Sequence, residues 1–364
     1  MVKILKWNFI FLLIAVLVIE LIFGGWLKNK KNFSYSLNRL GVIHGRQLIY
    51  DAKNIYGYPK QVVYTRDSFG FRGSLIFNNP QKIDILTVGG STTDQRLIND
   101  GDTWQDVLQK KLQENGIKTC IANAGVDGHS TFGHIASFKE WWEKLPQLKP
   151  KVIIFYVGIN DFLRNSVNPG FDENEKGAYA YIKRNSIIFN LLRLYRNNLN
   201  GTNYLGKNNK VIEKAANKVI LDTLVLLQKP DLHIVDSIRK SKSFKSFLAS
   251  YVKRIKILEQ MALMMNATPI FVLQPTATLF YHSDTIIALK NVAMGLNGYE
   301  YTVLKNEMDS SIKAHTQFTI DLAKKGLFEQ TDFYDLYHML PSGSLKVGRY
   351  LSDSLVLKYP NILN

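Results

Sequence analysis

The sequence is poor in cysteine and contains fewer acidic than basic residues. Its 364 residues include one cysteine, Cys120, so neither an internal disulfide nor a cysteine-based zinc site can form within the chain. The 30 Asp and Glu residues are outnumbered by 46 Lys and Arg residues, which gives a formal net charge of +16. Such a surface suits anionic lipids, anionic glycans or nucleic acids. Because the basic residues are scattered and no nucleic-acid-binding module is present, we expect no nucleic-acid partner.

A long hydrophobic run occupies residues 7–26 and has a tryptophan at each end. A helix of this length measures about 30 Å, the thickness of the hydrocarbon core of a bilayer. A cleaved signal peptide would have a shorter apolar region and a small-residue cleavage site, and no such site follows cleanly here. We therefore predict an uncleaved transmembrane anchor over residues 1–30, in which Glu20 is the one acidic side chain.

Lysines flank this run on both sides, and more of them follow it than precede it. That distribution alone would keep the following domain in the cytoplasm, but long domains translocate largely regardless of charge. We expect a membrane-anchored protein with a single N-terminal pass and an extracytoplasmic catalytic domain.

Beyond a lead-in segment over residues 31–82, strand patterns alternate with helical patterns. The predicted strands span residues 83–88, 118–122, 151–157 and 268–275. The predicted helices span residues 103–116 and 132–144, and a last helix follows Pro341, with Ser342 or Ser344 as its N-cap. This alternation predicts an α/β fold, in which a parallel sheet carries helices on both faces.

The predicted domain spans residues 83–364 and contains a helical insertion over about residues 165–265. Apolar residues recur there at helical spacing, at Phe247, Tyr251, Ile255, Leu258, Ala262 and Met265. We interpret this stripe as core packing. The insertion as a whole is expected to form a cap or side wall over the site, where substrate choice would reside.

Four short segments carry the parts that acyl transfer to a serine requires. They are residues 89–93 (Gly-Gly-Ser-Thr-Thr), 123–125 (Asn-Ala-Gly), 158–161 (Gly-Ile-Asn-Asp) and 335–338 (Asp-Leu-Tyr-His). The first three each follow a predicted strand, and the fourth is expected to open the last helix. Because ligands of parallel sheets bind beyond the carboxyl ends of the strands, we expect these segments to form one site.

Each segment supplies a different chemical group. Ser91 is the candidate nucleophile and His338 the candidate general base, with Asp335 three residues earlier to orient the imidazole. Gly125 can offer a backbone N–H, and Asn160 a side-chain amide, to a developing oxyanion. Taken singly, these residues are better explained as a helix cap, a surface Asp–His pair and ordinary turns.

Residues 89–93 do not match two other motifs that place a serine after a strand. The segment lacks the Gly-Lys-Ser/Thr ending of a phosphate-binding loop. It also lacks the Gly-x-Ser-x-Gly elbow of α/β-hydrolases, because Thr93 stands where the second glycine would be.

Over roughly residues 83–355, the chain resembles the SGNH (GDSL-type) serine hydrolase family. The signature residues of this family fall on Ser91, Gly125, Asn160 and His338, and Asp335 completes the Asp-x-x-His pair. The Gly-Asp-Ser-Leu block of the family is Gly-Gly-Ser-Thr here, as in many bacterial envelope-associated members. Residues 66–73 are similar to a segment that precedes the domain in such members.

The resemblance implies a three-layer, flavodoxin-like fold with no metal and no organic cofactor. It also implies that His338 deprotonates Ser91 and that Ser91 attacks an ester carbonyl. The oxyanion would then be held by the N–H groups of Ser91 and Gly125 and by the Asn160 amide.

We therefore predict a serine esterase that acts on acyl esters, in particular O-acetyl esters, of an envelope glycan, by hydrolysis or by transfer. Its expected partners are the acylated glycan or another ester substrate, and the membrane through the N-terminal helix. A lipase or phospholipid esterase is one alternative. A non-catalytic, glycan-binding envelope assembly protein is the other.

Overall fold

A computed structural model provides the structure of the chain. The residues that it describes are 2–26, 33–52, 61–73, 79–164, 181–182, 185–189, 191–192, 195, 210–211, 224–226, 233–282, 285–292, 295–324 and 326–360.

A five-stranded parallel sheet forms the centre of the fold. In spatial order, its strands are β11 (Thr319–Asp321), β8 (Thr268–Leu273), β5 (Val152–Tyr156), β3 (Ile85–Gly89) and β4 (Ile121–Asn123). The central strands β3 and β5 are buried along their whole length, as expected for strands covered on both faces. The α/β class and the four predicted strands are confirmed. The fifth strand, β11, has only three residues, which is too short to produce a hydrophobic pattern in the sequence.

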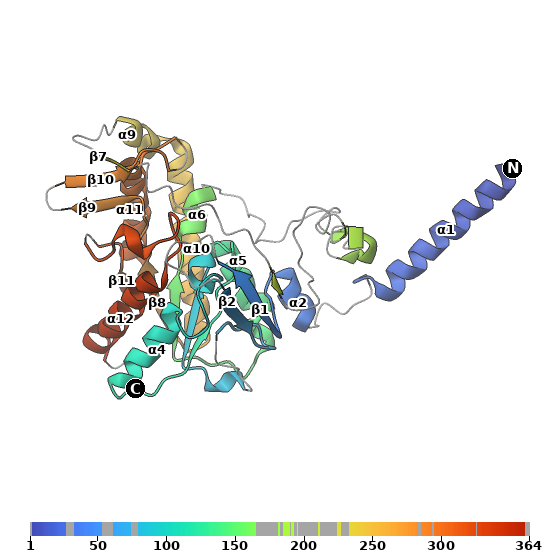
Figure 1. The fold of residues 1–364 in the computed structure, drawn as a ribbon, viewed down its shortest axis with the longest axis horizontal. Helices are drawn as coiled ribbons and strands as arrows, with labels where there is room; N and C mark the ends of the chain where they lie inside the picture. The colour runs from blue at the N-terminus through green and yellow to red at the C-terminus, as the bar shows by residue number, and fades with distance from the viewer. Residues whose placement is uncertain are drawn as a thin grey trace.

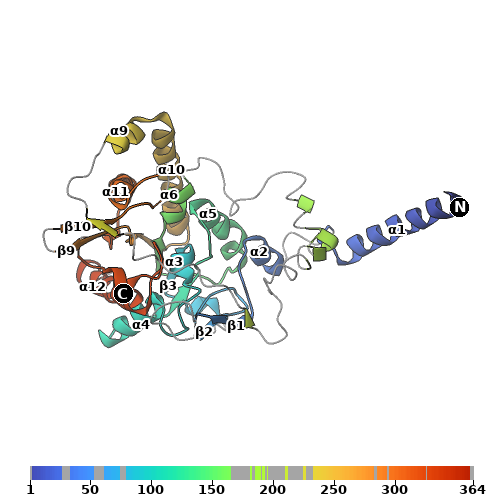
Figure 2. The same cartoon turned by 45° about the horizontal axis from the view of Figure 1, so that its top comes forward.

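Helices cover both faces of the sheet and produce three layers (Figure 1 and Figure 2). One layer contains α4 (Trp104–Glu114) and α12 (Pro341–Lys358), and the other contains α5 (Thr131–Glu140), α10 (Lys242–Met264) and α11 (Gly298–His315). Successive side chains of a strand point to opposite faces, so Ile154 packs with the first layer and Phe155 with the second. Two hydrophobic cores therefore hold the sheet between its helices.

The starts of two helices differ from the predicted positions by one or a few residues. Thr103 caps α4, and its side chain accepts a hydrogen bond from the N–H of Asp106. The prediction of Ser342 or Ser344 as the cap of the last helix is wrong, because α12 already begins at Pro341 with Leu340 as its N-cap. Proline suits the first position of a helix because it lacks the N–H that would have no partner there.

The apolar stripe predicted within the insertion lies on α10. Five of its six residues are buried, and Met265 packs against the core from the helix end. This confirms the stripe as core packing. Since α10 packs against α5, α11 and β8, it belongs to the helical layer. Of the predicted insertion, most of the part over residues 165–232 lies outside the described residues.

The lead-in segment folds onto the central domain. It contains α2 (Phe33–Arg39) and an antiparallel pair, β1 (Arg46–Asp51) and β2 (Gln61–Arg66). β1 also pairs in parallel with β6 (Lys210–Val211). Backbone hydrogen bonds from Arg72 N to Asn123 O (2.9 Å) and from Asp100 N to Val63 O (3.0 Å) tie the segment to the loops that follow β4 and α3.

Shorter elements complete the structure. An antiparallel sheet contains β7 (Leu224–Leu226), β10 (Thr285–Leu289) and β9 (Leu279–His282). The short helices are α3 (Ser91–Asp94), α6 (Ile159–Arg164), α9 (His233–Lys240) and the 3-10 turns Pro80–Lys82, Trp142–Lys144 and Gln330–Asp332.

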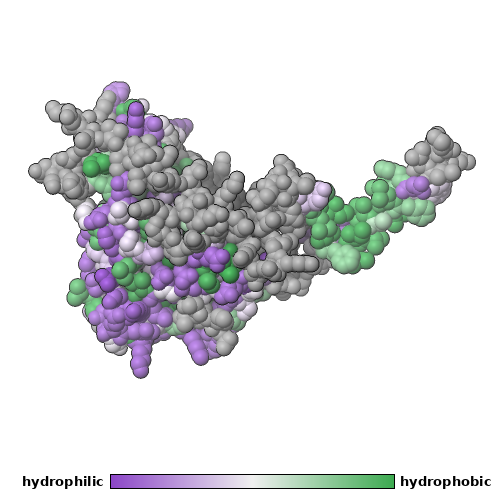
Figure 3. Space-filling view, in the orientation of Figure 1, coloured by the Kyte–Doolittle hydropathy of each residue, from purple (hydrophilic) through white to green (hydrophobic). Residues whose placement is uncertain are grey.

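The N-terminal helix α1 (Val2–Phe23) extends away from the body of the molecule (Figure 1). Figure 3 shows that its surface is largely hydrophobic, whereas hydrophilic residues are frequent on the body. Within the described part of the chain, Lys6–Phe23 is the one helical stretch long and apolar enough to cross a membrane, a property that secretory signal sequences share.

Glu20, the acidic residue of this helix, is surrounded by hydrogen-bond donors. Its carboxylate accepts hydrogen bonds from Trp26 Nε1 (2.7 Å), Ser186 Oγ (2.5 Å) and the Ile188 N–H (3.1 Å). These donors compensate the carboxylate for lost hydration at this position.

Candidate active site

Ser91 is the first residue of α3, which begins directly where β3 ends. Two glycines make this tight connection possible. A Cβ at Gly89 would lie 2.4 Å from the Tyr156 carbonyl oxygen, and a Cβ at Gly90 would lie 2.5 Å from Asn160 Nδ2. No side chain fits at either position without displacing its neighbours. The space that the aspartate of the Gly-Asp-Ser-Leu block would need is therefore taken here by the Asn160 amide.

The other end of α3 is held by Gln95. This residue adopts the left-handed conformation, with φ of 48°, which is uncommon for residues other than glycine. Its side chain compensates with two hydrogen bonds, one accepted from the Trp104 N–H (2.8 Å) and one donated to Ser344 Oγ (2.7 Å). The four-residue helix that carries Ser91 is thereby fixed to both α4 and α12.

Asp335 and His338 lie in a tight loop before α12. The sequence predicted that this segment opens the last helix. In the structure, the helix instead begins three residues after His338, at Pro341. Phe333 and Met339 form a β-bridge at the base of the loop, and Tyr334 N donates to His338 O (3.0 Å). Asp335 Oδ1 accepts hydrogen bonds from the N–H groups of Tyr337 (2.8 Å) and His338 (2.7 Å). The loop therefore positions the carboxylate and the imidazole together.

A continuous hydrogen-bonded chain joins Asp335, His338 and Ser91. Asp335 Oδ2 lies 2.6 Å from His338 Nδ1, and His338 Nε2 lies 2.7 Å from Ser91 Oγ. Because a carboxylate can only accept, Nδ1 carries the proton, so Nε2 of a neutral imidazole is the acceptor that faces the hydroxyl. Tyr334 stacks on the imidazole, with ring centroids 5.5 Å apart, and restricts its rotation.

Partial burial and mutual charge set the protonation of this pair. Burial disfavours the charged form of His338, but the hydrogen bond and negative charge of Asp335 outweigh it and raise the pKa of the imidazole above its ordinary value. Burial likewise disfavours the Asp335 carboxylate, yet the bonds from His338 and from the two backbone N–H groups lower its pKa. Asp335 therefore remains ionised while His338 titrates.

Asn160 lies beside the glycine that precedes Ser91. Its Nδ2 donates one hydrogen bond to the His129 carbonyl (2.8 Å), which leaves a second N–H on the amide. The same carbonyl would lie 2.9 Å from a Cβ at Gly90. The start of α3 is therefore in contact with two other segments, the start of α6 and the turn at residues 128–129.

Gly125 is placed differently from the expectation for an oxyanion donor. Its N–H donates to Asn123 Oδ1 (2.9 Å), and a Cβ on it would lie 2.3 Å from the Asp94 backbone nitrogen. Gly125 thus packs against the backbone of α3, and its N–H is hydrogen-bonded to Asn123. The turn that reaches Gly90 and Asn160 comes later, at Gly128, which has φ of 76°. A second glycine three residues after the first was the only sequence signal for this turn.

A buried cluster behind Ser91 was not found from the sequence. Arg66 donates to Asp94 Oδ1 (2.7 Å), to Tyr64 Oη (2.6 Å) and to the Gly125 carbonyl, while Tyr64 Oη donates to Asp94 Oδ1 (2.8 Å). The side chains of Arg66 and Asp94 are 2% and 0% exposed. Arg66 therefore joins the lead-in segment to α3 and to the loop after β4. Only its place in the Arg-Asp-Ser-Phe-Gly-Phe-Arg-Gly segment pointed to it.

Three other residues have structural partners. Asp161 accepts hydrogen bonds from the Thr131 N–H (3.0 Å) and hydroxyl (2.5 Å), and so joins the start of α6 to the start of α5. The His129 imidazole is buried and donates through Nε2 to the Leu40 carbonyl (2.8 Å). Cys120 is half-buried in the core, and burial raises its thiol pKa. In the part of the chain that the structure describes, no three His, Cys, Asp or Glu residues gather in a way that could hold a metal ion.

A comparison with known protein families matches the part of the chain that carries Ser91. Residues 87–239 match the GDSL-like Lipase/Acylhydrolase family, and the matched range includes Ser91 and Asn160. Over these residues, the chain therefore contains a GDSL-like lipase/acylhydrolase domain. No curated protein sequence matches the chain.

Several solved structures are similar to it. A member of the lipolytic protein G-D-S-L family from Veillonella parvula is 12% identical, and the match covers 77% of this chain and 99% of that one, with a TM-score of 0.39. The acetyl xylan esterase AlAXEase is 13% identical over 75% of this chain and 100% of its own, with a TM-score of 0.38. The psychrotrophic esterase EstA from a Pseudoalteromonas species is 11% identical over 76% of this chain and 98% of its own, with a TM-score of 0.38.

Proposed function

We propose that Ser91, His338 and Asp335 form the catalytic triad of an esterase. The observation that carries this proposal is the unbroken chain of hydrogen bonds of 2.6 Å and 2.7 Å from the carboxylate to the hydroxyl. His338 Nε2 accepts the proton of Ser91 Oγ as that oxygen attacks the ester carbonyl. The resulting imidazolium then donates the proton to the leaving alkoxide, and an acyl-enzyme remains. Water, or a sugar hydroxyl in a transfer reaction, attacks this intermediate with the same base.

The oxyanion is stabilised in this proposal by donors around the start of α3. The N–H of Ser91 has no partner within the helix, because the first N–H groups of any helix lack one. The second N–H of Asn160 is available beside it. Gly125 is the third proposed donor, and its N–H would have to exchange Asn123 Oδ1 for the oxyanion.

The proposed substrate is an O-acetylated or otherwise O-acylated glycan of the cell envelope. The apolar helix α1 supports a protein held at the membrane, with residues 1–30 as the anchor and the catalytic domain outside the cytoplasm. The net charge of +16 supports attraction to anionic envelope polymers.

Labelling with a fluorophosphonate tests the triad. We expect the full chain in detergent to form one covalent adduct, mapped by mass spectrometry to Ser91. The rate of hydrolysis of short-chain esters such as p-nitrophenyl acetate should fall in proportion to the fraction of protein that is labelled. A folded protein that takes up no label would contradict the proposal and favour the non-catalytic, glycan-binding alternative. Faster turnover of long-chain than of short-chain esters would instead indicate a lipase.

The pH dependence of kcat/KM should report the titration of His338. Only neutral His338 can accept a proton, so activity is expected to rise with pH through a midpoint above the ordinary histidine pKa of about 6.5. In Asp335→Asn, the negative charge that raises the pKa of His338 is lost, while burial still lowers this pKa. The midpoint should therefore move to lower pH, and kcat should fall about 10⁴-fold. An unchanged midpoint in this variant would show that Asp335 does not act on His338.

Removal of the Asn160 amide tests the oxyanion site. We expect Asn160→Ala to lower kcat about 10²–10³-fold with little change in KM, because the lost donor acts where charge develops in the transition state. The thermal midpoint of the variant serves as control, since Asn160 also donates to the His129 carbonyl. A rise in KM at unchanged kcat would argue against this role.

A further inference from the structure

A pocket of about 270 Å³ lies beside the Ser91 site, between the loop after β8, helix α11 and the loop after β11. Its wall begins at Gln274, whose Oε1 accepts a hydrogen bond from Thr92 Oγ1 (3.0 Å), the residue next to Ser91. Ala277 in the same loop donates its N–H to the Leu336 carbonyl (2.9 Å), within the loop that carries Asp335 and His338. The pocket therefore adjoins the two segments that bear the proposed triad.

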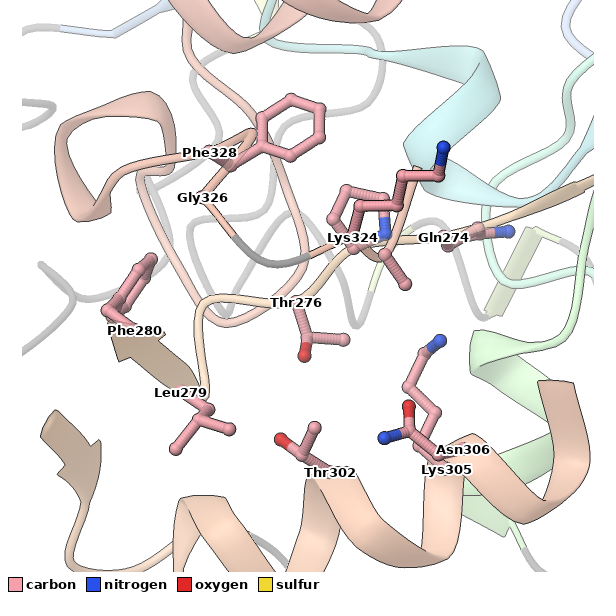
Figure 4. A pocket seen from close by; sticks show the side chains of 12 residues that line it. Gln274, Thr276, Leu279, Phe280, Thr302, Lys305, Asn306, Lys324, Gly326 and Phe328 are labelled. Carbon is pink, nitrogen blue, oxygen red and sulfur yellow. The ribbon is translucent and has the colours of Figure 1, made fainter. Parts of the chain in front are cut away.

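The walls of this pocket combine polar and aromatic side chains. Half of the twelve lining residues are polar, namely Gln274, Thr276, Thr302, Lys305, Asn306 and Lys324. Figure 4 shows Phe280 and Phe328 on one side of the space and Gln274, Lys305 and Lys324 on the other. A long acyl chain would meet too many polar groups here. A small ligand with both an apolar face and polar edges fits better.

The threonines of the pocket are oriented by a hydrogen-bond relay. Thr302 Oγ1 donates to the Gly298 carbonyl (2.7 Å), which can only accept, so the Thr302 proton is used. Thr278 must then donate to Thr302 (3.0 Å), and Thr276 must donate to Thr278 (2.7 Å). Thr276 is left with free acceptor lone pairs, so the pocket offers an acceptor for ligand hydroxyl groups.

The charged residues of the pocket are all cationic. The lining includes Lys305 and Lys324 and no acidic residue. Lys305 gives one of its N–H groups to the buried Asp309 (2.6 Å), and no second acceptor lies within hydrogen-bond distance among the described residues. Lys324 is exposed, with its ammonium group 5.6 Å from the centre of the Tyr350 ring and hydrogen-bonded to Tyr350. Among the described residues it forms no ion pair. The pocket therefore favours an anionic group.

We propose that this pocket is a subsite for an acidic sugar unit of the ester substrate, a hydroxylated ring that carries a carboxylate or a phosphate. The inference rests on the proposed function, because it assigns the sugar next to the ester that Ser91 attacks. The ring would place its apolar face against the phenylalanines, its hydroxyls at Thr276 and its anionic group at Lys305 and Lys324.

Binding of simple sugars to the full chain in detergent tests this subsite. Dissociation constants for galacturonate, galactose 6-phosphate and galactose are measured by NMR titration. We expect at least one acidic sugar to bind about tenfold more tightly than galactose and to weaken as salt is added. The better of the two acidic sugars identifies the anionic group. Equal binding of all three sugars, or no binding, overturns the proposal.

Lys324→Gln should remove this preference, and Lys324→Arg should restore it. Lys149→Gln is the matched control, because it makes the same charge change at an exposed lysine outside the pocket. A preference that survives in folded Lys324→Gln contradicts the assignment. The fluorophosphonate experiment is independent of these titrations. Labelling of Ser91 without acidic-sugar binding keeps the esterase and removes the subsite. Acidic-sugar binding without labelling contradicts the esterase, and with it the assignment of the pocket as a subsite of an ester substrate.

Discussion

Replacement of Ser91 by alanine is expected to lower kcat for p-nitrophenyl acetate by about 10⁴–10⁶-fold. The Ser91 hydroxyl lies 2.7 Å from His338 Nε2, and the acyl-enzyme cannot form without this hydroxyl. The residual rate would come from the oxyanion donors and from substrate binding. Steady-state rates of purified wild-type and variant protein measure the effect.

The fold should tolerate this change, because Ser91 occupies a first helical position where alanine is also accepted. Ser310→Ala is the matched control: Ser310 is exposed on α11 and should leave kcat unchanged. A Ser91→Ala variant that keeps the wild-type rate would place the nucleophile elsewhere.

Replacement of Arg66 by methionine is expected to cost about 3–5 kcal/mol in the free energy of unfolding. The guanidinium is buried and donates to Asp94, Tyr64 and the Gly125 carbonyl. Without it, the buried Asp94 carboxylate would keep the hydrogen bond from Tyr64 (2.8 Å) but would have only the longer ion pair with Arg96, at 3.7 Å. Because Asp94 is the last residue of α3, we also expect kcat to fall through misplacement of Ser91.

Urea unfolding followed by tryptophan fluorescence measures this loss for the full chain in detergent. The double variant Arg66→Met with Asp94→Asn removes the unpaired charge and should recover part of the stability. Arg349→Met replaces an exposed arginine of α12 and should change the free energy of unfolding by less than about 0.5 kcal/mol. If Arg66→Met were as stable as this control, the buried cluster would have no role in joining the lead-in segment to the domain.

Local sequence patterns were sufficient for the long elements and for the candidate site. The apolar runs of β3, β5 and β8 and the alternation with helices predicted the parallel sheet, because strands buried on both faces need continuous hydrophobic residues. The strand ends then predicted where Ser91 and Asn160 would lie. Asp335 and His338 were paired by their spacing alone, and the structure brings His338 to Ser91 across 247 residues of sequence.

Features that depend on contacts distant in the sequence were not accessible in this way. The three-residue strand β11 exists only because β8 offers it a partner. The engagement of the Gly125 N–H depends on the rotamer of Asn123, and the Arg66 cluster depends on how the lead-in segment docks. The pocket beside Ser91 is formed by α11 and two loops that no local pattern relates to one another.

By itself, the sequence therefore determined the α/β sheet, the apolar N-terminal helix and the four segments of the site, because hydrophobic periodicity and short motifs are local properties. Only the tertiary structure decided which donors face Ser91, which buried charges support α3 and what lines the neighbouring pocket. Those outcomes arise from packing between distant segments, where burial and hydrogen-bond geometry, and not the order of residues along the chain, select the partners.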